Sequence, residues 1–306
     1  MPHVPLPASH TFTLTETQGT SLRALLERLN FEFSELPYAH FSARKGKCSV
    51  AHYLSGKTVI QGKEAREFIE FHFEPEITQQ AVLGYEEELN PENYQPHIGV
   101  DEAGKGDFFG PLVIAGVFVR PHSVRELIRA GVRDSKRVGS DRAVRELADR
   151  VKELTPNAHS IIAIGPKRYN ELYSRMGNLN RLLAWGHGQV ISNLVSLHPD
   201  CPRALSDQFA HPSLIERELK RKNITLQLDQ RTKAESDTAV AAASILARDA
   251  FVTQLTALGG DSPLPKGASA HVKTRAIEIL RHQGLEALAP LCKNHFKTFT
   301  EVQKEA

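Results

Sequence analysis

Two adjacent acids set between apolar segments constrain this chain more than any other feature of its sequence. Asp101 and Glu102 follow the short apolar stretch 97–100, and the glycine-rich turn 104–110 separates them from the longest apolar run, residues 112–119. Short apolar runs bounded by glycine or proline are typical of buried strands. Because acids are almost never fully buried unless they are paired, a strand that ends in two carboxylates must supply them with a partner.

After residue 119 the sequence alternates between stretches with the hydrophobic periodicity of strands and stretches with that of helices. Apolar and alternating stretches predict strands at residues 160–164, 204–207 and 224–228, and helical spacing predicts helices at 178–197 and 237–252. Early strands that lie close together in the chain, followed by strands that alternate with helices, indicate a mixed sheet covered by helices. The predicted fold class is therefore α/β of the mixed α+β kind.

The first 85 or so residues form a separate pattern. Leucines recur at helical spacing from Leu22 to Leu29, after Thr20 and Ser21, either of which could cap that helix. Glycine turns at residues 46 and 56 break the stretch 31–61, which indicates an antiparallel meander, and helical spacing returns at 64–73. We expect a small α+β domain with one open sheet face.

Length and composition set the domain organisation. A chain of 306 residues is long enough for two domains at roughly 100–200 residues each. The acidic, proline-bearing stretch 86–93 is the expected linker, which places the domains at residues 1–88 and 95–306. The composition, 41% hydrophobic and 24% charged, is typical of globular proteins.

Several protein classes have no support in the sequence. The longest apolar run is far short of the roughly 20 residues that span a membrane, and residues 1–10 lack the basic and apolar regions of a secretion signal. Three cysteines, Cys48, Cys201 and Cys292, lie far apart without a CxxC motif, which fits a reducing compartment. We therefore expect a cytoplasmic protein with no membrane partner.

Positive charge is concentrated locally within an acidic domain. Residues 1–90 carry 8 Lys and Arg against 12 Asp and Glu, yet residues 41–66 carry six basic side chains and a single acid. Such a cluster favours a polyanionic partner such as nucleic acid. The alternative is an ordinary solvated surface. The six basic residues are Arg44, Lys45, Lys47, Lys57, Lys63 and Arg66.

Two further acids adjoin apolar elements in the same way as the first pair. Asp207 ends the predicted strand 204–207, and Asp237 begins an alanine-rich helix. If all four acids converge, their repulsion requires one or two divalent cations, and oxygen ligands favour Mg²⁺ or Mn²⁺ over zinc. Two such ions suit phosphodiester hydrolysis. The alternative is that these acids are unconnected caps and turn residues.

Other chemistries are poorly supported. The turn 104–110 has one residue too many for a dinucleotide fingerprint and precedes a strand instead of a helix. No P-loop, HExxH or GxSxG motif is present, and we expect His187, on the 178–197 helix, to be a structural histidine. Glycines beside the acid pair can instead let the backbone approach a nucleic-acid strand closely; the alternative is a plain tight turn.

At this point several motifs resemble one family. Residues 98–113, Ile-Gly-Val-Asp-Glu-Ala-Gly-Lys-Gly-Asp-Phe-Phe-Gly-Pro-Leu-Val, are similar to the opening strand and turn of type 2 ribonucleases H, in particular the ribonuclease HIII branch. The resemblance covers nearly the whole chain. Further similar stretches are 134–136 (Asp-Ser-Lys), 178–187, 206–207, 235–245, and, in the first domain, 41–49 and 61–64.

The resemblance implies a ribonuclease H-like mixed sheet flanked by helices, with a TATA-binding-protein-like domain at the N-terminus. It implies that Asp101, Glu102, Asp207 and Asp237 are catalytic, metal-binding carboxylates served by Mg²⁺ or Mn²⁺, two ions in the active complex. The implied activity is endonucleolytic cleavage of the RNA strand of RNA/DNA hybrids, leaving 5′-phosphate and 3′-hydroxyl ends. Gly104, Lys105 and Gly106 are similar to the turn that reads ribose 2′-hydroxyls in the minor groove.

Two differences from the ribonuclease HII pattern favour the ribonuclease HIII branch of the family. Asp107 and Phe108 occupy positions that distinguish ribonuclease HIII from ribonuclease HII, and residues 263–269 lack the tyrosine by which ribonuclease HII senses an RNA–DNA junction. We therefore expect weak excision of single ribonucleotides. Lys266 in that segment is a candidate phosphate contact or a plain surface lysine. The alternatives are ribonuclease HII-like junction processing and a non-catalytic nucleic-acid-binding protein, and the default oligomeric state is a monomer.

Overall fold

The structure is a computed structural model that describes residues 9–79, 87, 90–132, 138–232 and 234–305. The chain divides into two compact units, residues 1–92 with 129–131 and residues 93–128 with 132–306. The 134–136 motif lies outside the described residues. So does part of the expected linker, although Pro91–Tyr94 forms the short helix α4. None of the described helices is long and apolar enough to cross a membrane.

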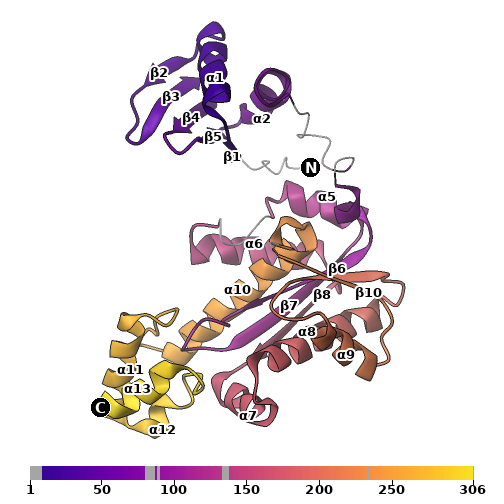
Figure 1. Ribbon diagram of the computed structural model, residues 1–306, viewed down its shortest axis with the longest axis vertical. Helices are drawn as coiled ribbons and strands as arrows, with labels where there is room; N and C mark the ends of the chain where they lie inside the picture. The colour runs from indigo at the N-terminus through magenta and orange to yellow at the C-terminus, as the bar shows by residue number, and fades with distance from the viewer. Residues whose placement is uncertain (1–8, 80–86, 88–89, 133–137, 233, 306) are drawn as a thin grey trace. The chain divides into compact units, whose positions relative to one another are not determined.

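The first unit is a five-stranded antiparallel sheet with helices packed on one face (Figure 1). The strand order is β1-β5-β4-β3-β2. The α+β domain expected from the sequence is thus present. Its elements are β1 (Ser9–Thr13), α1 (Glu16–Arg28), β2 (Glu32–Ser34), β3 (Ala39–Lys45), β4 (Cys48–Tyr53), β5 (Lys57–Gln61), α2 (Ala65–Phe68) and the π-helix η1 (Ile69–Thr78).

The helix α1 begins earlier than the leucine spacing predicts. Thr15, not Thr20 or Ser21, is the N-cap: its hydroxyl accepts from the Gln18 backbone, and the Gln18 side chain bonds the Thr15 N–H in return. This reciprocal capping satisfies two backbone donors that a helix start otherwise leaves unpaired. Thr20 instead donates to the Glu16 carbonyl inside the helix. The predicted cap was therefore wrong, because Thr20 and Ser21 lie more than one turn inside the helix.

The meander β3–β4–β5 is confirmed, and among the described residues of this unit helices pack on only one face of the sheet and leave the other uncovered. Alternate residues, including Val50 and Ile60, pack against the helices in a core of their own. Residues that alternate with these, such as Ser42, Ala51 and Val59, are half-exposed and follow one another across the three strands in register. The uncovered face is therefore lined by small side chains at its centre.

The second unit is built on a mixed five-stranded sheet in the order β10-β9-β6-β7-β8. The pairs β6–β7 and β7–β8 are antiparallel, whereas β6–β9 and β9–β10 are parallel. The mixed sheet predicted from the sequence is confirmed. The strands are β6 (His97–Ala103), β7 (Leu112–Val119), β8 (His159–Ile164), β9 (Arg203–Asp207) and β10 (Gln227–Arg231).

Helices cover both faces of this sheet, which explains why its central strands are apolar throughout. The long helix α10 (Thr238–Gly259) packs on one face and α8 (Leu179–Leu197) on the other (Figure 1). All eight residues of β7 are buried between them. The remaining helices are α5 (Pro121–Arg129), α6 (Asp141–Leu154), α7 (Pro166–Met176), α9 (Ser213–Arg221), η3 (Ala234–Ser236), α11 (Ala270–Gln283), α12 (Leu285–Leu288) and α13 (Lys297–Glu305).

One strand lies further along the chain than predicted. The stretch 224–228 alternates as a strand should, but the last parallel strand is β10, three residues later, because its residues pair with β9 from Gln227↔Arg203 to Arg231↔Asp207. Partner contacts therefore outweighed local alternation. The structure also contains the C-terminal helices α11 to α13, for which we made no prediction.

Gly99 fixes how closely α10 approaches β6. A Cβ atom at this position would lie 2.2 Å from the Val240 nitrogen and 2.3 Å from the Ala239 carbonyl carbon. Both are backbone atoms, so no side-chain rotation could relieve the overlap. The glycine thus permits direct contact between the start of the helix and the central strand.

We expect Gly99→Ala to destabilise the protein by about 1–3 kcal/mol or more. The added methyl group would overlap the backbone of α10 and push the helix away from β6. The free energy of unfolding in urea measures this. Gly139→Ala is the matched control, because a Cβ there meets no atom within 4 Å, and it should change stability by less than about 0.5 kcal/mol. Equal effects of the two substitutions would contradict this account of Gly99.

Candidate nucleic-acid-cleaving site

The acid pair lies in regular strand and projects to both faces of the sheet. β6 continues its pairing with β7 through Ala103, so neighbouring side chains point in opposite directions. Asp101 lies on the α10 face, where the Ser244 hydroxyl bonds its carboxylate. Glu102 lies on the α8 face, where its Oε2 is 3.1 Å from the His187 Nε2. The two acids therefore flank the end of one strand.

Asp207 reaches the same end of the sheet from the neighbouring strand. β9 runs parallel to β6, and the last paired residues are Val100 and Ser206, so the next residues, Asp101 and Asp207, leave the ladder side by side. Adjacent strands lie about 4.8 Å apart. Asp207 Oδ1 accepts a hydrogen bond from the Ala234 backbone at 3.3 Å. Three predicted acids, Asp101, Glu102 and Asp207, thus lie near the same end of the sheet, with Asp101 and Asp207 in adjacent strand positions and Glu102 on the opposite face.

Charge crowding is visible in the acid pair. Burial, and after it repulsion from Glu102, raises the pKa of Asp101 to about 6. Burial acts on Glu102 in the same sense, but the hydrogen bond and charge of His187, together with the Lys105 ammonium, outweigh it and lower the pKa of Glu102. The ionised form of Glu102 is therefore stabilised by its neighbours, whereas that of Asp101 is disfavoured by burial and by the adjacent charge.

His187 is more than the structural histidine that the sequence suggested, because it contacts Glu102. Its side chain is fully buried, and its Nδ1 has no hydrogen-bond partner among the described residues. The proton therefore belongs on Nε2, which faces the carboxylate. Phe209 packs on the ring at 4.9 Å between centroids, and the Lys105 ammonium lies 5.6 Å from the centre of the same phenyl ring and 3.4 Å from Glu102 Oε1.

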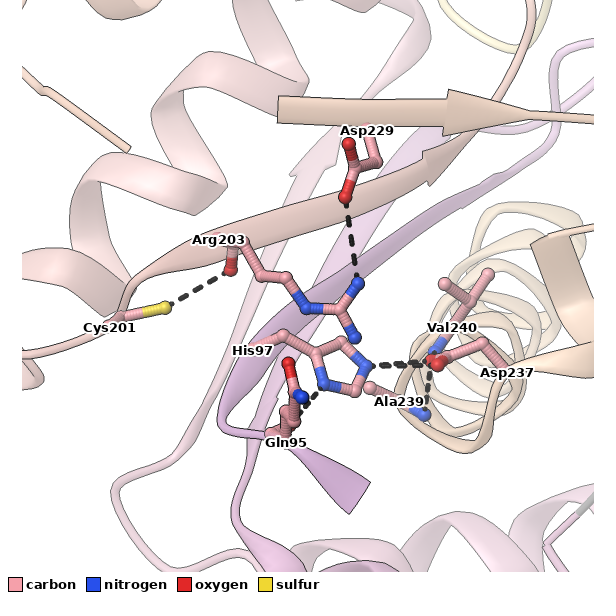
Figure 2. Close-up of polar contacts among 8 residues, drawn as sticks. All are labelled: Gln95, His97, Cys201, Arg203, Asp229, Asp237, Ala239 and Val240. Atoms are coloured by element: carbon pink, nitrogen blue, oxygen red, sulfur yellow. Dashed lines mark hydrogen bonds and ion pairs between the residues drawn. The ribbon is translucent and has the colours of Figure 1, made fainter. Parts of the chain in front are cut away.

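Asp237 has a different environment from the other three acids. It is the N-cap of α10: its Oδ1 accepts from the backbone of Ala239 at 2.9 Å and Val240 at 3.1 Å. Both of its oxygens lie 3.0 Å from His97 Nε2, and His97 Nδ1 bonds the Gln95 carbonyl (Figure 2). Asp237 and His97 are both fully buried, so this carboxylate is enclosed and its oxygens are already bound.

The described contacts of Asp237 are thus with His97 and the helix backbone, and its place among the carboxylates stays a prediction from the sequence. His97 stands at the beginning of β6, four residues and about 13 Å before Asp101. Along the helix, Asp237 precedes Ser244, the partner of Asp101, by two turns or about 10 Å. An aspartate directly before an alanine-rich helix is a typical cap, and this local role explains its position.

A different acid, Glu235, adjoins the site. It lies in η3, the short turn between β10 and α10, and is half-buried. Its neighbour Ala234 donates the backbone hydrogen bond to Asp207. The sequence offered two acids at this point, Glu235 and Asp237, and the cap signal at Asp237 was the feature that could have separated them.

The donor set suits a hard divalent cation, although it is not closed around a single point. Carboxylate oxygens are the ligands that Mg²⁺ and Mn²⁺ prefer. Burial, and after it repulsion from Glu102, raises the pKa of Asp101, and a bound cation would favour its ionised form. Among the residues that the structure describes, no three His, Cys, Asp or Glu side chains are grouped as one metal cage. Glu102 lies on the opposite face of the strand, and the described acids on the α10 face do not form such a group either.

The glycine turn lies directly beside the acids. Gly104 is held by packing, since a Cβ there would lie 2.2 Å from the Pro111 carbonyl oxygen and its φ is +86°. Gly106, in contrast, is exposed and a Cβ there would meet nothing within 4 Å. The tip of the turn is therefore open to a close-approaching ligand.

The other predicted nucleic-acid contacts fall into two groups. Lys266 forms an ion pair with Asp141 at 2.6 Å, and Lys45 donates to the Leu29 carbonyl on the helix side of the first sheet. Arg66, from the same basic cluster, lies 3.9 Å from Glu70 in an ion pair. The remaining four are exposed in the first unit, two of them on strands of the sheet and two in the adjoining turns. They are Arg44, Lys57, Lys47 and Lys63.

Comparison with known proteins identifies the family. The family described as Ribonuclease HII matches residues 98–299, and a domain of unknown function, DUF3378, matches residues 11–82. Curated relatives named Ribonuclease HIII include that of Protochlamydia amoebophila, 44% identical over 90% of this chain and 91% of the relative, and that of Chlamydia abortus, 41% identical over 95% and 96%. The chain belongs to the ribonuclease HIII family.

Solved structures agree with this assignment. Bst-RNase HIII in complex with Mn²⁺ has a TM-score of 0.67 and 27% identity over 98% of this chain and 99% of that one. Aquifex aeolicus RNase H3 has a TM-score of 0.54 and 25% identity over 93% and 98%. The mixed sheet with its additional N-terminal domain, the ribonuclease H endonuclease function and the metal dependence of this ribonuclease HIII follow from its family.

We expect His187→Leu to weaken Mn²⁺ binding by about 10–100-fold, because it removes the donor that orients Glu102. Isothermal titration of the protein alone with Mn²⁺ measures this. His187→Gln keeps a side-chain N–H of similar reach and should weaken Mn²⁺ binding much less than the leucine substitution does. Equal Mn²⁺ affinities for the leucine variant and the unmodified protein would show that His187 does not act on Glu102.

Proposed function

We propose that this protein cleaves the RNA strand of RNA/DNA hybrids, and that Asp101, Glu102, Asp207 and Glu235 are its metal-binding carboxylates. The observation that carries the proposal is the position of three acids within two residues of the ends of β6 and β9, directly before an open glycine turn. In open α/β sheets, ligands bind beyond the carboxyl ends of the strands where parallel neighbours diverge. Glu235 takes the place that the sequence gave to Asp237.

The residues of the site divide the chemistry among them. Two divalent cations, Mg²⁺ or Mn²⁺, would supply a hydroxide nucleophile and stabilise the leaving 3′-oxygen, so that the products carry 5′-phosphate and 3′-hydroxyl ends. Asp101 and Asp207 offer oxygens at the ends of β6 and β9, and Glu102 offers them on the α8 face with His187 holding its orientation. The direct backbone contact between β6 and α10 at Gly99 helps to keep these positions rigid.

Recognition of the hybrid is assigned to two surfaces, each described on its own unit. The exposed Gly106 tip, with Lys105 beside it, would approach the ribose 2′-hydroxyls that distinguish RNA from DNA. Arg44, Lys47, Lys57 and Lys63 of the TATA-binding-protein-like domain at 1–88 would contact phosphates sequence-independently. Lys45 and Lys266 are poorer candidates because a carbonyl and a carboxylate already engage them.

We expect Asp101→Asn to lower kcat by at least about 100-fold while hybrid binding in chelator stays within about threefold, since it removes a metal ligand without altering the binding surfaces. Cleavage of a labelled RNA/DNA hybrid with and without chelator measures this. The same assay on a DNA duplex with one embedded ribonucleotide tests the ribonuclease HII-like alternative. Preferential cleavage of that duplex would favour it, and near-normal turnover by Asp101→Asn would contradict the catalytic assignment.

We expect Glu235→Gln to lower kcat by at least about 100-fold and Asp237→Asn to stay within about tenfold of the unmodified enzyme. Asparagine caps helices as well as aspartate does, so the Asp237 substitution preserves α10, whereas the Glu235 substitution removes a ligating charge. Mn²⁺ titration of each variant gives an independent readout. The reverse order of the two effects would return Asp237 to the catalytic set.

We expect Arg44→Ala with Lys57→Ala to reduce the slope of log affinity against log salt by about one unit for each phosphate that the variant no longer neutralises. Fluorescence anisotropy with a labelled hybrid in chelator measures binding without cleavage. Arg28→Ala is the matched control, because Arg28 pairs with Glu76 on the helix side of the same domain. A salt slope equal to that of the control would leave Arg44 and Lys57 without this role.

A further inference from the structure

A lysine is fully buried behind the glycine turn, outside the carboxylate site. Lys293 follows α12 and has no exposed surface. Its Nζ donates to the Asp107 carbonyl oxygen at 2.7 Å, lies 3.5 Å from that of Phe109, and lies 5.7 Å from the centre of the Tyr169 ring. Lysine is almost never fully buried unless its charge is compensated. Here carbonyl dipoles and an aromatic face provide the compensation.

This arrangement is energetically demanding. Burial lowers the pKa of Lys293 to about 8, against the opposing influence of Asp107 and Cys292. A methionine of the same length would fill the space without desolvating a charge, although it would leave the two carbonyl groups unpaired. A buried titratable group with a perturbed pKa is a candidate for a functional role.

Lys293 belongs to a set of contacts that hold one end of the glycine turn. Its backbone N–H donates to the Phe108 carbonyl at 2.9 Å, and the Gly110 N–H donates to the Leu291 carbonyl at 3.0 Å. From the other side, the Gly267 N–H donates to Asp107 Oδ1 at 2.6 Å, and the Phe108 N–H donates to the Gly267 carbonyl. The segment 107–110 is therefore held between the 267 loop and the C-terminal segment.

The position of this segment determines where the turn tip lies. The Asp107 N–H closes the turn onto the Gly104 carbonyl at 3.3 Å. Gly104 continues directly from the strand that carries Glu102, and Asp107 is the residue whose carbonyl Lys293 holds. The exposed Gly106 lies between these two fixed ends, so it cannot move far without breaking one of them.

We propose that Lys293 is a positioning residue for nucleic-acid recognition: its buried ammonium fixes the far end of the 104–107 turn, so that Lys105 and Gly106 meet the substrate at a set distance from Glu102. The inference rests on the proposed role of this turn in binding the hybrid. By this inference, the C-terminal segment around Lys293 helps to position the substrate-binding turn, although it supplies none of the four proposed metal ligands.

Kinetics of Lys293→Met on a labelled RNA/DNA hybrid test the proposal. We expect KM to rise about tenfold or more with kcat within about threefold, because a displaced turn impairs binding of the substrate. Mn²⁺ affinity measured on the protein alone should stay within about twofold, since the substitution replaces none of the four proposed metal ligands. Val302→Ala is the matched control: it opens a cavity under α13, where Val302 is fully buried, and should lower the melting temperature while KM stays within about twofold.

A second variant keeps the test decisive if Lys293→Met does not fold. Asn170 bonds the Cys292 carbonyl and the Asn294 N–H, both at 3.0 Å, so Asn170→Ala loosens the segment that carries Lys293 without removing the ammonium. A KM raised severalfold in this variant supports the proposal, and an unchanged KM overturns it.

Other outcomes separate the proposal from the function on which it rests. A Lys293→Met enzyme whose KM changes no more than that of Val302→Ala, or whose defect lies in kcat or Mn²⁺ affinity, overturns the positioning role. The unmodified enzyme is assayed first, and failure to cleave the hybrid with metal would contradict the proposed function itself. Normal cleavage by the unmodified enzyme with an unaltered KM in Lys293→Met contradicts the role of Lys293 alone.

Discussion

The direct contact between the start of α10 and the central strand β6 is the constraint on which the site depends. Because Gly99 has no side chain, the helix backbone lies against the strand, and the register between the two elements is fixed at that point. Further along the helix, Ser244 reaches Asp101. Before the helix begins, η3 brings Ala234 to Asp207. The site thus follows from a packing contact that itself carries no chemistry.

The two faces of the sheet give adjacent acids different surroundings. Asp101 is buried next to another carboxylate, whereas Glu102 has His187 and Lys105 for partners, and the pKa values of the two acids shift in opposite directions for that reason. Separation across a strand gives the two acids of one dipeptide different partners near the same strand end. A metal-dependent nuclease requires such oxygen donors, but it also requires a scaffold that tolerates their repulsion.

The glycine turn depends on parts of the chain that lie far from it in sequence. Gly104 packs under Phe251 of α10, and Asp107 is held by Lys293 and by the loop at Gly267. The 263–269 segment and the C-terminal segment therefore act on the same turn from two sides. In this ribonuclease HIII the segments after α10 support the turn beside the acids as well as completing the fold.

The sequence by itself predicted the small α+β part, the mixed sheet and the glycine-turned meander, and it located Asp101, Glu102 and Asp207 within two residues of strand ends. These depend on local periodicity and on turn residues, which a linear pattern records. Tertiary structure alone decided that His97 binds Asp237, whose role as a cap the sequence allowed, and that Ala234 donates to Asp207. It alone also decided that His187 contacts Glu102 and that Lys293 contacts the turn. Each of these contacts joins residues distant in the chain, and which side chain a strand or helix finally meets depends on packing that no local spacing encodes.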